Sequence, residues 1–385
     1  MNSTVNCETF KERPQLDLER QQKAREYSSL KRRLGFFEAI FVLAALSAII
    51  FSGFSSYLTG LFNIPAIPSA IVYFLILIAA FEIVTAPVSY YGGYILPRRY
   101  GISTQNFRQW LSDVLKGGLI ELFLGVAAVA VIYWLLNSFP EIWWLIAWGL
   151  MLIVTVIFSL LAPVLLVPIF YKVRPMEGSE LKTRLENLAA KAGAKVQGIY
   201  TLDFSSKGTT ANAGLMGIGK TRRIVVSDTL INRYTPAEIE VITAHEIAHH
   251  LHGDIFRLFI VQSAIYLLIF RITDLLFGYS AAQIGFSGIA DPSALPLLLL
   301  IFTFLAAIAS PLLNAYSRKA ETQADAFAIT LTRDPDSFID AMTRLTNQNL
   351  AVADPPKWDE FIFHDHPSYN KRRETAEYFK RKNNC

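Results

Sequence analysis

The sequence predicts a mainly α-helical integral membrane protein with about six transmembrane helices and a small cytoplasmic α/β domain. Two observations indicate this fold class. Hydrophobic residues make up 52% of the 385 residues and charged residues only 18%, with a mean hydropathy of +0.34. A chain of that composition has more apolar surface than one aqueous core can bury. In addition, apolar stretches long enough to cross a bilayer recur along the chain.

Six such stretches are found, and two of them contain residues that disturb a regular helix. The second holds Glu82 and Pro87, and the fourth carries Pro163 and Pro168, where the chain is expected to kink. The segment before the first stretch is polar and charged, so this stretch is expected to act as an uncleaved anchor. The stretches cover residues 36–58, 66–90, 117–137, 142–171, 255–277 and 293–316.

Basic residues in the connecting segments predict the orientation. The N-terminal segment 1–35 and the 92–116 loop are rich in Lys and Arg, whereas the connections at 59–65, 138–141 and 278–292 contain neither. Positive charge is retained on the cytoplasmic side of a membrane. Six spans then place both termini, together with residues 172–254 and 317–385, in the cytoplasm.

Charge and cysteine content exclude two classes of function. The net charge of +4 is too small to indicate a nucleic-acid partner. Cys7 and Cys385 stand near opposite ends of the chain and form neither a disulfide framework nor a metal-binding pair. Two free thiols in a reducing compartment are expected.

The first cytoplasmic piece reads as mixed α/β. A helix with Leu181, Leu185 and Leu188 precedes expected strands at 197–203 and 223–228. The glycine-rich stretch 206–219 between them predicts a hairpin or an exposed edge strand. Its Asn212-Ala213-Gly214 segment would then bind a peptide substrate as an added strand. The alternative for this segment is an ordinary surface loop.

The motif that carries chemistry is His245-Glu246-Ile247-Ala248-His249. The sequence Thr235-Pro236-Ala237-Glu238 predicts a capped helix start ahead of it. Two histidines four residues apart lie on one helical face, where both imidazoles can bind one tetrahedral zinc ion. Glu246 lies beside them as the expected general base. Two histidines on an ordinary solvated helix are the alternative.

A catalytic zinc site needs a third protein ligand and an open fourth position for water, and the candidate for the third ligand is Glu321. It lies 72 residues after His249. The two intervening spans form a hairpin that returns the chain to the same side of the membrane. Asp325 lies one turn beyond Glu321 on the same face and is expected to accept the second ring N–H of a ligand histidine. Solvated helix residues are the alternative for both.

Together these motifs predict a zinc endopeptidase with one Zn²⁺ per chain. Its domain would cover residues 172–385, including the spans 255–277 and 293–316, and would follow the transmembrane segment 36–171. Zinc would polarise the scissile carbonyl, and Glu246 would pass a water proton to the leaving amine. His366 and Arg372 in the C-terminal tail would stabilise the intermediate or hold a substrate carbonyl. A solvated tail is the other interpretation.

These residues resemble the CAAX prenyl protease 1 family of integral-membrane, gluzincin-type metallopeptidases. The similarity covers about residues 66–380, and its motifs are Asn212-Ala213-Gly214, the HExxH helix, Glu321-x-x-Ala-Asp325 and His366-Pro367 with Arg372. The resemblance implies the zinc ligands, base and supporting aspartate named above. It implies that His366 and Arg372 contact the substrate, and that the Asn212 strand pairs with the substrate backbone. It also implies membrane helices that enclose a water-filled chamber.

Six spans and a short chain are more similar to a bacterial member of that family. The resemblance therefore implies the bacterial inner membrane as location, and membrane-associated or prenylated CAAX-like polypeptides as substrates. Two other classes compete. A site-2-type protease would place HExxH inside a span and use an aspartate as third ligand. A metal-binding transporter or scaffold would need the ligands but no base, and would often show internal repeats.

Overall fold

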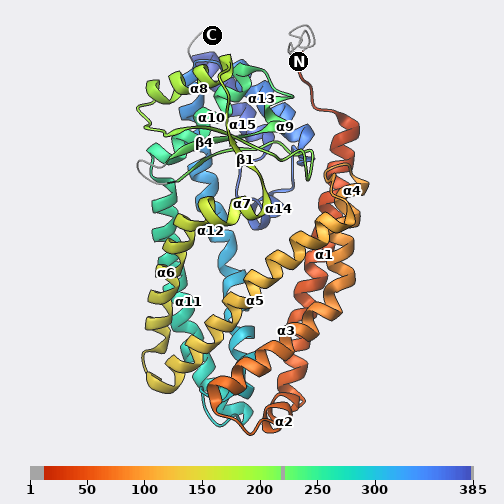
Figure 1. Ribbon diagram of the computed structural model, residues 1–385, viewed down its shortest axis with the longest axis vertical. Helices are drawn as coiled ribbons and strands as arrows, with labels where there is room; N and C mark the ends of the chain where they lie inside the picture. Colours follow the sequence, from red (N-terminus) through yellow and green to blue (C-terminus); the bar gives the residue numbers. More distant parts are fainter. Residues whose placement is uncertain (1–12, 218–221, 383–385) are drawn as a thin grey trace.

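The computed structural model describes residues 13–217 and 222–382. Long helices form one part of the elongated molecule, and a four-stranded sheet with its covering helices lies at one end (Figure 1). Helix α1 begins and helix α15 ends at this same end. Cys7, Cys385 and the last two residues of the glycine-rich stretch 206–219 lie outside the described residues.

Six helices in the described residues are long and apolar enough to cross a membrane, as the sequence predicted, so the chain is a multi-pass membrane protein. Only a small part of each apolar window is buried within the protein, which leaves most of that surface to lipid or to an internal space. The helices are Leu18–Phe51 (α1), Ala66–Arg99 (α3 to α4), Phe107–Ser138 (α5), Trp143–Phe170 (α6 to α7), Asp254–Ile284 (α11) and Pro292–Thr332 (η5 and α12).

The first span differs from its prediction. The sequence predicts one apolar span over residues 36–58, but α1 ends at Phe51 and a short helix, α2 (Phe54–Gly60), follows. Gly53 between them has a left-handed φ of 72°, which ends the first helix. The helix also begins well before the apolar residues, because Asp17 caps its N-terminus by accepting a hydrogen bond from Arg20 N.

The predicted kink in the fourth span is a π-helical turn. Residues Ala162–Leu166 (η3) join α6 (Trp143–Leu161) to α7 (Val167–Phe170). Pro163 and Pro168 lie in and just after this turn, where their missing N–H groups interrupt regular α-helical hydrogen bonding. A second π-helical turn, Tyr91–Ile95 (η2), follows Pro87 near the end of α3 (Ala66–Tyr90), before α4 (Leu96–Arg99).

The α/β part contains a four-stranded sheet in the order β1-β2-β4-β3. Strands β2 and β4 pair in parallel, whereas β1 and β3 pair antiparallel at the two edges. The glycine-rich stretch therefore contributes an edge strand, one of the two forms that the sequence predicted. The strands are Val173–Pro175 (β1), Gly198–Leu202 (β2), Ala213–Met216 (β3) and Arg223–Ser227 (β4).

One apolar core joins this sheet to the helices around it. Ile199, Ile224 and Val226 of the sheet are buried together with Ile239 and Phe338 of the helices.

Strand β1 was not predicted from the sequence, because it is only three residues long. The helices are Glu180–Lys191 (α8), Asp228–Ile231 (α9), Pro236–Leu251 (α10), Pro335–Gln348 (α13), Lys357–Phe363 (α14) and Tyr369–Lys382 (α15).

Helix α12 connects the membrane part to the α/β part. It runs from Leu295 to Thr332 without a break, and its last turns pack against α10. Helix α11 precedes it and lies alongside it, which forms the expected hairpin (Figure 1). The hairpin returns the chain to α10, so residues near the end of α12 face residues of that helix.

Candidate active site

Helix α10 carries His245, Glu246 and His249, and its start is fixed by a capping box. The Thr235 side chain accepts a hydrogen bond from Glu238 N (3.2 Å), and the Glu238 side chain accepts one from Thr235 N (2.7 Å). The two histidines, four residues apart, project from the same face of the helix. His245 is buried, and His249 is partly buried.

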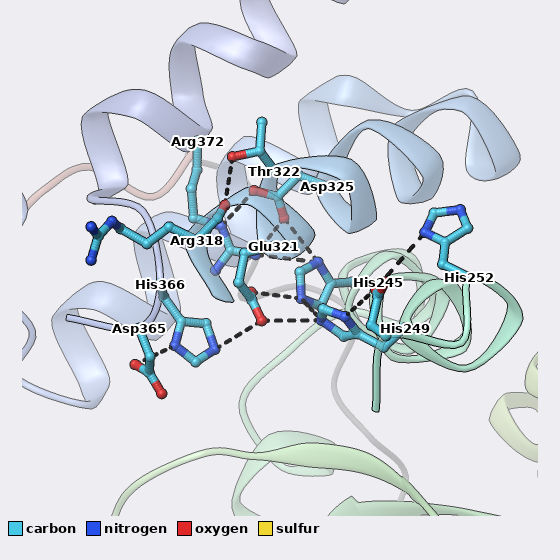
Figure 2. A network of polar contacts seen from close by, with 11 residues as sticks. His245, His249, His252, Arg318, Glu321, Thr322, Asp325, Asp365, His366 and Arg372 are labelled. Carbon is cyan, nitrogen blue, oxygen red and sulfur yellow. Dashed lines mark hydrogen bonds and ion pairs between the residues drawn. The ribbon is translucent and has the colours of Figure 1, made fainter. Parts of the chain in front are cut away.

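Four ligand-type atoms converge between α10 and α12 (Figure 2). His245 Nε2 lies 3.1 Å from Glu321 Oε2, and His249 Nε2 lies 3.1 Å from Glu321 Oε1. The two Nε2 atoms are themselves 3.1 Å apart. The three residues thus offer ligand atoms within 4.8 Å of one another, and the structure brings together the three residues that the sequence predicted as zinc ligands.

The contacts of the two Nδ1 atoms indicate which ring nitrogens are free to bind a metal. His245 Nδ1 lies 2.9 Å from Asp325 Oδ1, and His249 Nδ1 lies 3.0 Å from Asp254 Oδ2. Each Nδ1–H then donates to a carboxylate, which leaves both Nε2 atoms as acceptors facing each other. Glu321 Oε2, although close to His245 Nε2, is buried without a hydrogen-bond partner among the described residues.

Four acceptor atoms that face one another in a buried site repel unless a positive charge, supplied by a metal ion or by an added proton, lies between them. Two imidazole nitrogens and a carboxylate form a donor set that zinc accepts. The residues present therefore fit the metal that their spacing predicts.

Asp254 was not identified from the sequence. It begins α11 directly after Gly253, whose left-handed φ of 69° turns the chain sharply at the end of α10. This turn places Asp254 against His249 and within 4.0 Å of His252 Nδ1. The sequence signal for Asp254 is its position five residues after His249, directly after a glycine that can turn the chain back toward the motif.

The C-terminal helix contributes Arg372, which supports Asp325. Arg372 Nε and Nη2 donate to the two oxygens of Asp325 at 2.8 and 2.5 Å. Nη2 also lies 3.4 Å from His245 Nδ1. Arg372, Asp325 and His245 thus form a connected series in which a two-pronged ion pair fixes the carboxylate that faces the histidine (Figure 2).

His366 approaches Glu321 from the other side. Its Nε2 lies 3.4 Å from Glu321 Oε1, and its Nδ1 lies 2.8 Å from Asp365 Oδ1. This contact with Asp365 raises the pKa of His366 and lowers the pKa of Asp365. Sequence reasoning named His366 but not Asp365, because nothing in a loop sequence indicates which neighbour a histidine ring will face.

A cavity of about 1130 Å³ opens onto this cluster. Its lining includes His245, Glu246 and His366, together with Ala213 of the edge strand and Arg32 of α1. Burial raises the pKa of Glu246, and the neighbouring histidines oppose this shift. The expected base therefore lies in the cavity wall next to the ligand cluster.

The predicted substrate strand lies at the same cavity, with its residues in different orientations. Asn212 and Ala213 line the cavity, and Gly214 follows within β3. Asn212 O accepts a hydrogen bond from Ser227 N (2.9 Å), and Asn212 N donates to Ser227 Oγ (3.0 Å). The backbone of Asn212 thus faces β4, while its neighbour Ala213 is directed to the open edge.

Comparisons with known proteins find matches along most of the chain. Residues 7–172 match the sequence model of the CAAX prenyl protease N-terminal region, with five membrane helices, and residues 175–380 match that of Peptidase family M48. An uncharacterized metalloprotease of Bacillus subtilis, YhfN, is 31% identical over 77% of this chain and 70% of its own length. A probable CAAX prenyl protease 1 of Schizosaccharomyces pombe is 27% identical over 79% of this chain and 64% of its own length.

A solved structure shares the fold. The crystal structure of S. mikatae Ste24p superposes with a TM-score of 0.83 and covers 96% of this chain and 93% of its own, at 23% sequence identity. The likeness extends over both the membrane helices and the α/β part, and it matches the fold class that the sequence predicted.

Proposed function

This chain belongs to peptidase family M48 and is a membrane metallopeptidase, and we propose that it acts as a zinc-dependent endopeptidase on membrane-associated or CAAX-like polypeptides. The observation that carries the proposal is the convergence of His245, His249 and Glu321 beside Glu246, at the wall of a large cavity. A metal-binding transporter or scaffold would have no use for a base at that position.

We assign one zinc ion per chain to His245, His249 and Glu321. Asp325 and Asp254 would hold the two imidazoles in the tautomer that presents Nε2 to the metal. When bound, zinc polarises the scissile carbonyl and makes the attacking water more acidic. Arg372 would act by positioning Asp325, since two of its nitrogens are bound to that carboxylate.

The proton transfers fall to Glu246. Its carboxylate would accept a proton from the attacking water as the new C–O bond forms. It would then donate that proton to the amine nitrogen as the C–N bond breaks. Burial raises the pKa of Glu246, which makes its carboxylate a stronger acceptor for the proton of the water. His366, whose Nε2 lies 3.4 Å from Glu321 Oε1, would donate a hydrogen bond to the carbonyl oxygen as negative charge develops there.

A polypeptide substrate would pair with the open edge of β3 at Asn212-Ala213-Gly214. The name of the fission yeast relative supports CAAX-like substrates, and the bacterial relative supports a location in a bacterial inner membrane. The basic residues of the N-terminal segment and the 92–116 loop support a cytoplasmic location for the termini and the site. We accordingly assign residues 172–385 to the peptidase domain, which follows the N-terminal membrane segment.

The first test compares Glu246→Gln with wild type and with Glu240→Gln. Glu240 lies on the same helix, where it pairs with Arg184 away from the site, so it controls for the loss of a carboxylate from α10. The proteins would be purified in detergent, and their zinc content and cleavage of prenylated and unprenylated peptides measured. Glu246→Gln should keep about one zinc per chain and lose about 10²- to 10⁴-fold in kcat/KM.

Three results would contradict parts of the proposal. Full activity in Glu246→Gln would show that Glu246 is not the general base. Absence of zinc from all three proteins would contradict the assignment of zinc to this site. Equal cleavage of prenylated and unprenylated peptides would restrict the substrate class to unmodified polypeptides.

A further inference from the structure

The segment that leads into the edge strand is held by side chains from other elements. Thr209 O accepts a hydrogen bond from Gln348 Nε2 (2.6 Å), and Thr210 O accepts one from Thr229 Oγ1 (2.7 Å). Thr209 N donates to Ile102 O (2.9 Å) in the loop before α5. The position of the edge strand is therefore fixed before its first paired residue.

Backbone groups along this segment alternate between the sheet and the open edge. Asn212 O accepts a hydrogen bond from Ser227 N, which continues the ladder with β4, and Asn212 N donates to the Ser227 side chain. Successive residues of a strand direct their N–H and C=O groups to opposite sides, so Ala211, Ala213 and Leu215 face away from β4. In the described residues no strand covers that side.

The first of these outward positions is already occupied by the side-chain amide of Asn349. Ala211 N donates to Asn349 Oδ1 (2.9 Å), and Asn349 Nδ2 donates to Ala211 O (3.2 Å). A neighbouring strand would make the same pair of hydrogen bonds with this residue. The Asn349 amide thus takes the place of one residue of an added strand.

The turn that holds Asn349 is strained and anchored. Asn349 caps the C-terminus of α13, and the next residue, buried Leu350, has a left-handed φ of 53°, which is unfavourable for a leucine. The buried Gln21 side chain of α1 donates to Ala351 O (3.1 Å) and accepts from Ala353 N (2.9 Å). Such strain persists only where surrounding contacts impose it, and here those contacts fix the Asn349 amide.

We propose that Asn349 is a positioning residue that sets the register of the bound substrate by ending the available edge at Ala211. Ala211, Ala213, Asn349 and Glu246 line the same cavity. A substrate strand can then pair with Ala213 and Leu215, but it cannot pair with Ala211, whose backbone groups are bound to Asn349. This limit fixes the register of the substrate and so determines which peptide bond is presented to Glu246. This inference rests on the proposed pairing of substrate with β3.

The test is a backbone N-methylation scan of a cleaved peptide, since an N-methyl group removes one donor at a chosen position. With wild type, methylation at two positions two residues apart should each lower kcat/KM about fivefold, the value of one hydrogen bond. The position two residues further toward Ala211 should be insensitive, because Asn349 occupies the groups that it would pair with. In Asn349→Ala, that third position should become sensitive, and cleavage at neighbouring bonds should appear in the product masses.

Gln348→Ala is the matched control. It removes the hydrogen bond to Thr209 O and loosens the same segment, but it leaves the amide on Ala211. A purely structural role for Asn349 predicts that both variants lose activity with the wild-type scan pattern unchanged. If Asn349→Ala does not fold, Asn349→Asp keeps the acceptor for Ala211 N and frees only Ala211 O, so it should show a weaker form of the same change.

The outcomes separate this inference from the proposed function. Absence of cleavage by wild type would overturn the proposed function and the inference with it. Cleavage without any N-methyl sensitivity would overturn the strand pairing and the register role, while the peptidase would stand. Cleavage with the same pattern and the same products in wild type and Asn349→Ala would overturn the register role alone.

Discussion

The two candidate ligand histidines are oriented by carboxylates that reach them from different parts of the chain. Asp325 lies on α12 with Glu321 and is fixed by Arg372 of α15. Asp254 lies at the start of α11, just past the end of the HExxH helix. Each carboxylate favours one tautomer of its histidine, so both are expected to contribute to metal affinity without touching the metal.

We therefore predict that Asp254→Asn weakens zinc binding by about 10- to 100-fold, because the hydrogen-bond partner of His249 Nδ1 loses its charge. Titration of the metal-free protein against a zinc chelator of known affinity measures this change. The exposed Asp354→Asn is the matched control and should bind as wild type does. An unchanged affinity in Asp254→Asn would show that His249 needs no such partner.

At this scale the sequence identified the residues that repeat at helical spacing. His245, His249, Glu321 and Asp325 follow from one-turn intervals on two helices, and a helix places such residues whatever surrounds it. Asp254 and Asp365 depend on how the chain turns after a helix ends. That direction is set by single backbone angles and by packing, neither of which hydrophobic periodicity reports.

At the scale of the elements, helix α10 begins at a capping box that is also tied to α13. One oxygen of Glu238 accepts from Thr235 N, and the other accepts from Arg344 Nε (2.8 Å). Loss of the cap therefore disturbs a buried carboxylate as well as the helix end. The position of His245 and His249 depends on this start.

Thr235→Ala should destabilise the protein by about 1 kcal/mol through the lost cap alone, with a further loss from Glu238. Ser179→Ala removes a single cap bond from α8, where Ser179 accepts from Lys182 N (3.2 Å), and should have the smaller effect. Apparent melting temperatures in detergent, with zinc present, measure both. An equal or smaller shift for Thr235→Ala would contradict the reciprocal role of Glu238.

Most elements were predictable because their signals are local. The capping box at Thr235, the π-helical turn at Pro163 and the edge strand after Asn212 each follow from residues within a few positions. The break at Gly53 was not anticipated, since apolar residues continue across it and hydropathy alone predicts one span. The sequence likewise did not predict which strands pair with each other, because strand pairing depends on tertiary packing.

At the scale of the whole molecule, the six spans and the charge of their connections predict a single orientation. The loop between α5 and α6 and the helix α8 should lie on opposite sides of the membrane. The number of spans followed from composition and length, since only apolar helices satisfy their backbone in lipid. The arrangement of the spans around the α/β part did not follow from hydropathy, because helix contacts within a membrane depend on side-chain shape.

Cysteine labelling tests this orientation. In a variant with Cys7 and Cys385 replaced by serine, Glu141→Cys lies in the exposed α5–α6 loop and Glu186→Cys on the exposed face of α8. A membrane-impermeant maleimide added to intact cells should label position 141 only, and inverted vesicles should be labelled at position 186 only. The reverse pattern would place the site on the outer side, and labelling of both from one side would contradict the span count.

The hairpin of α11 and α12 separates Glu321 from the two histidines along the chain. During synthesis, the histidine pair leaves the ribosome long before the third ligand does. Glu321 can reach that pair only after both intervening helices have been integrated into the bilayer. The proposed metal site would therefore be completed late in the biogenesis of the protein, so an incompletely synthesised chain that lacks Glu321 would lack the third ligand.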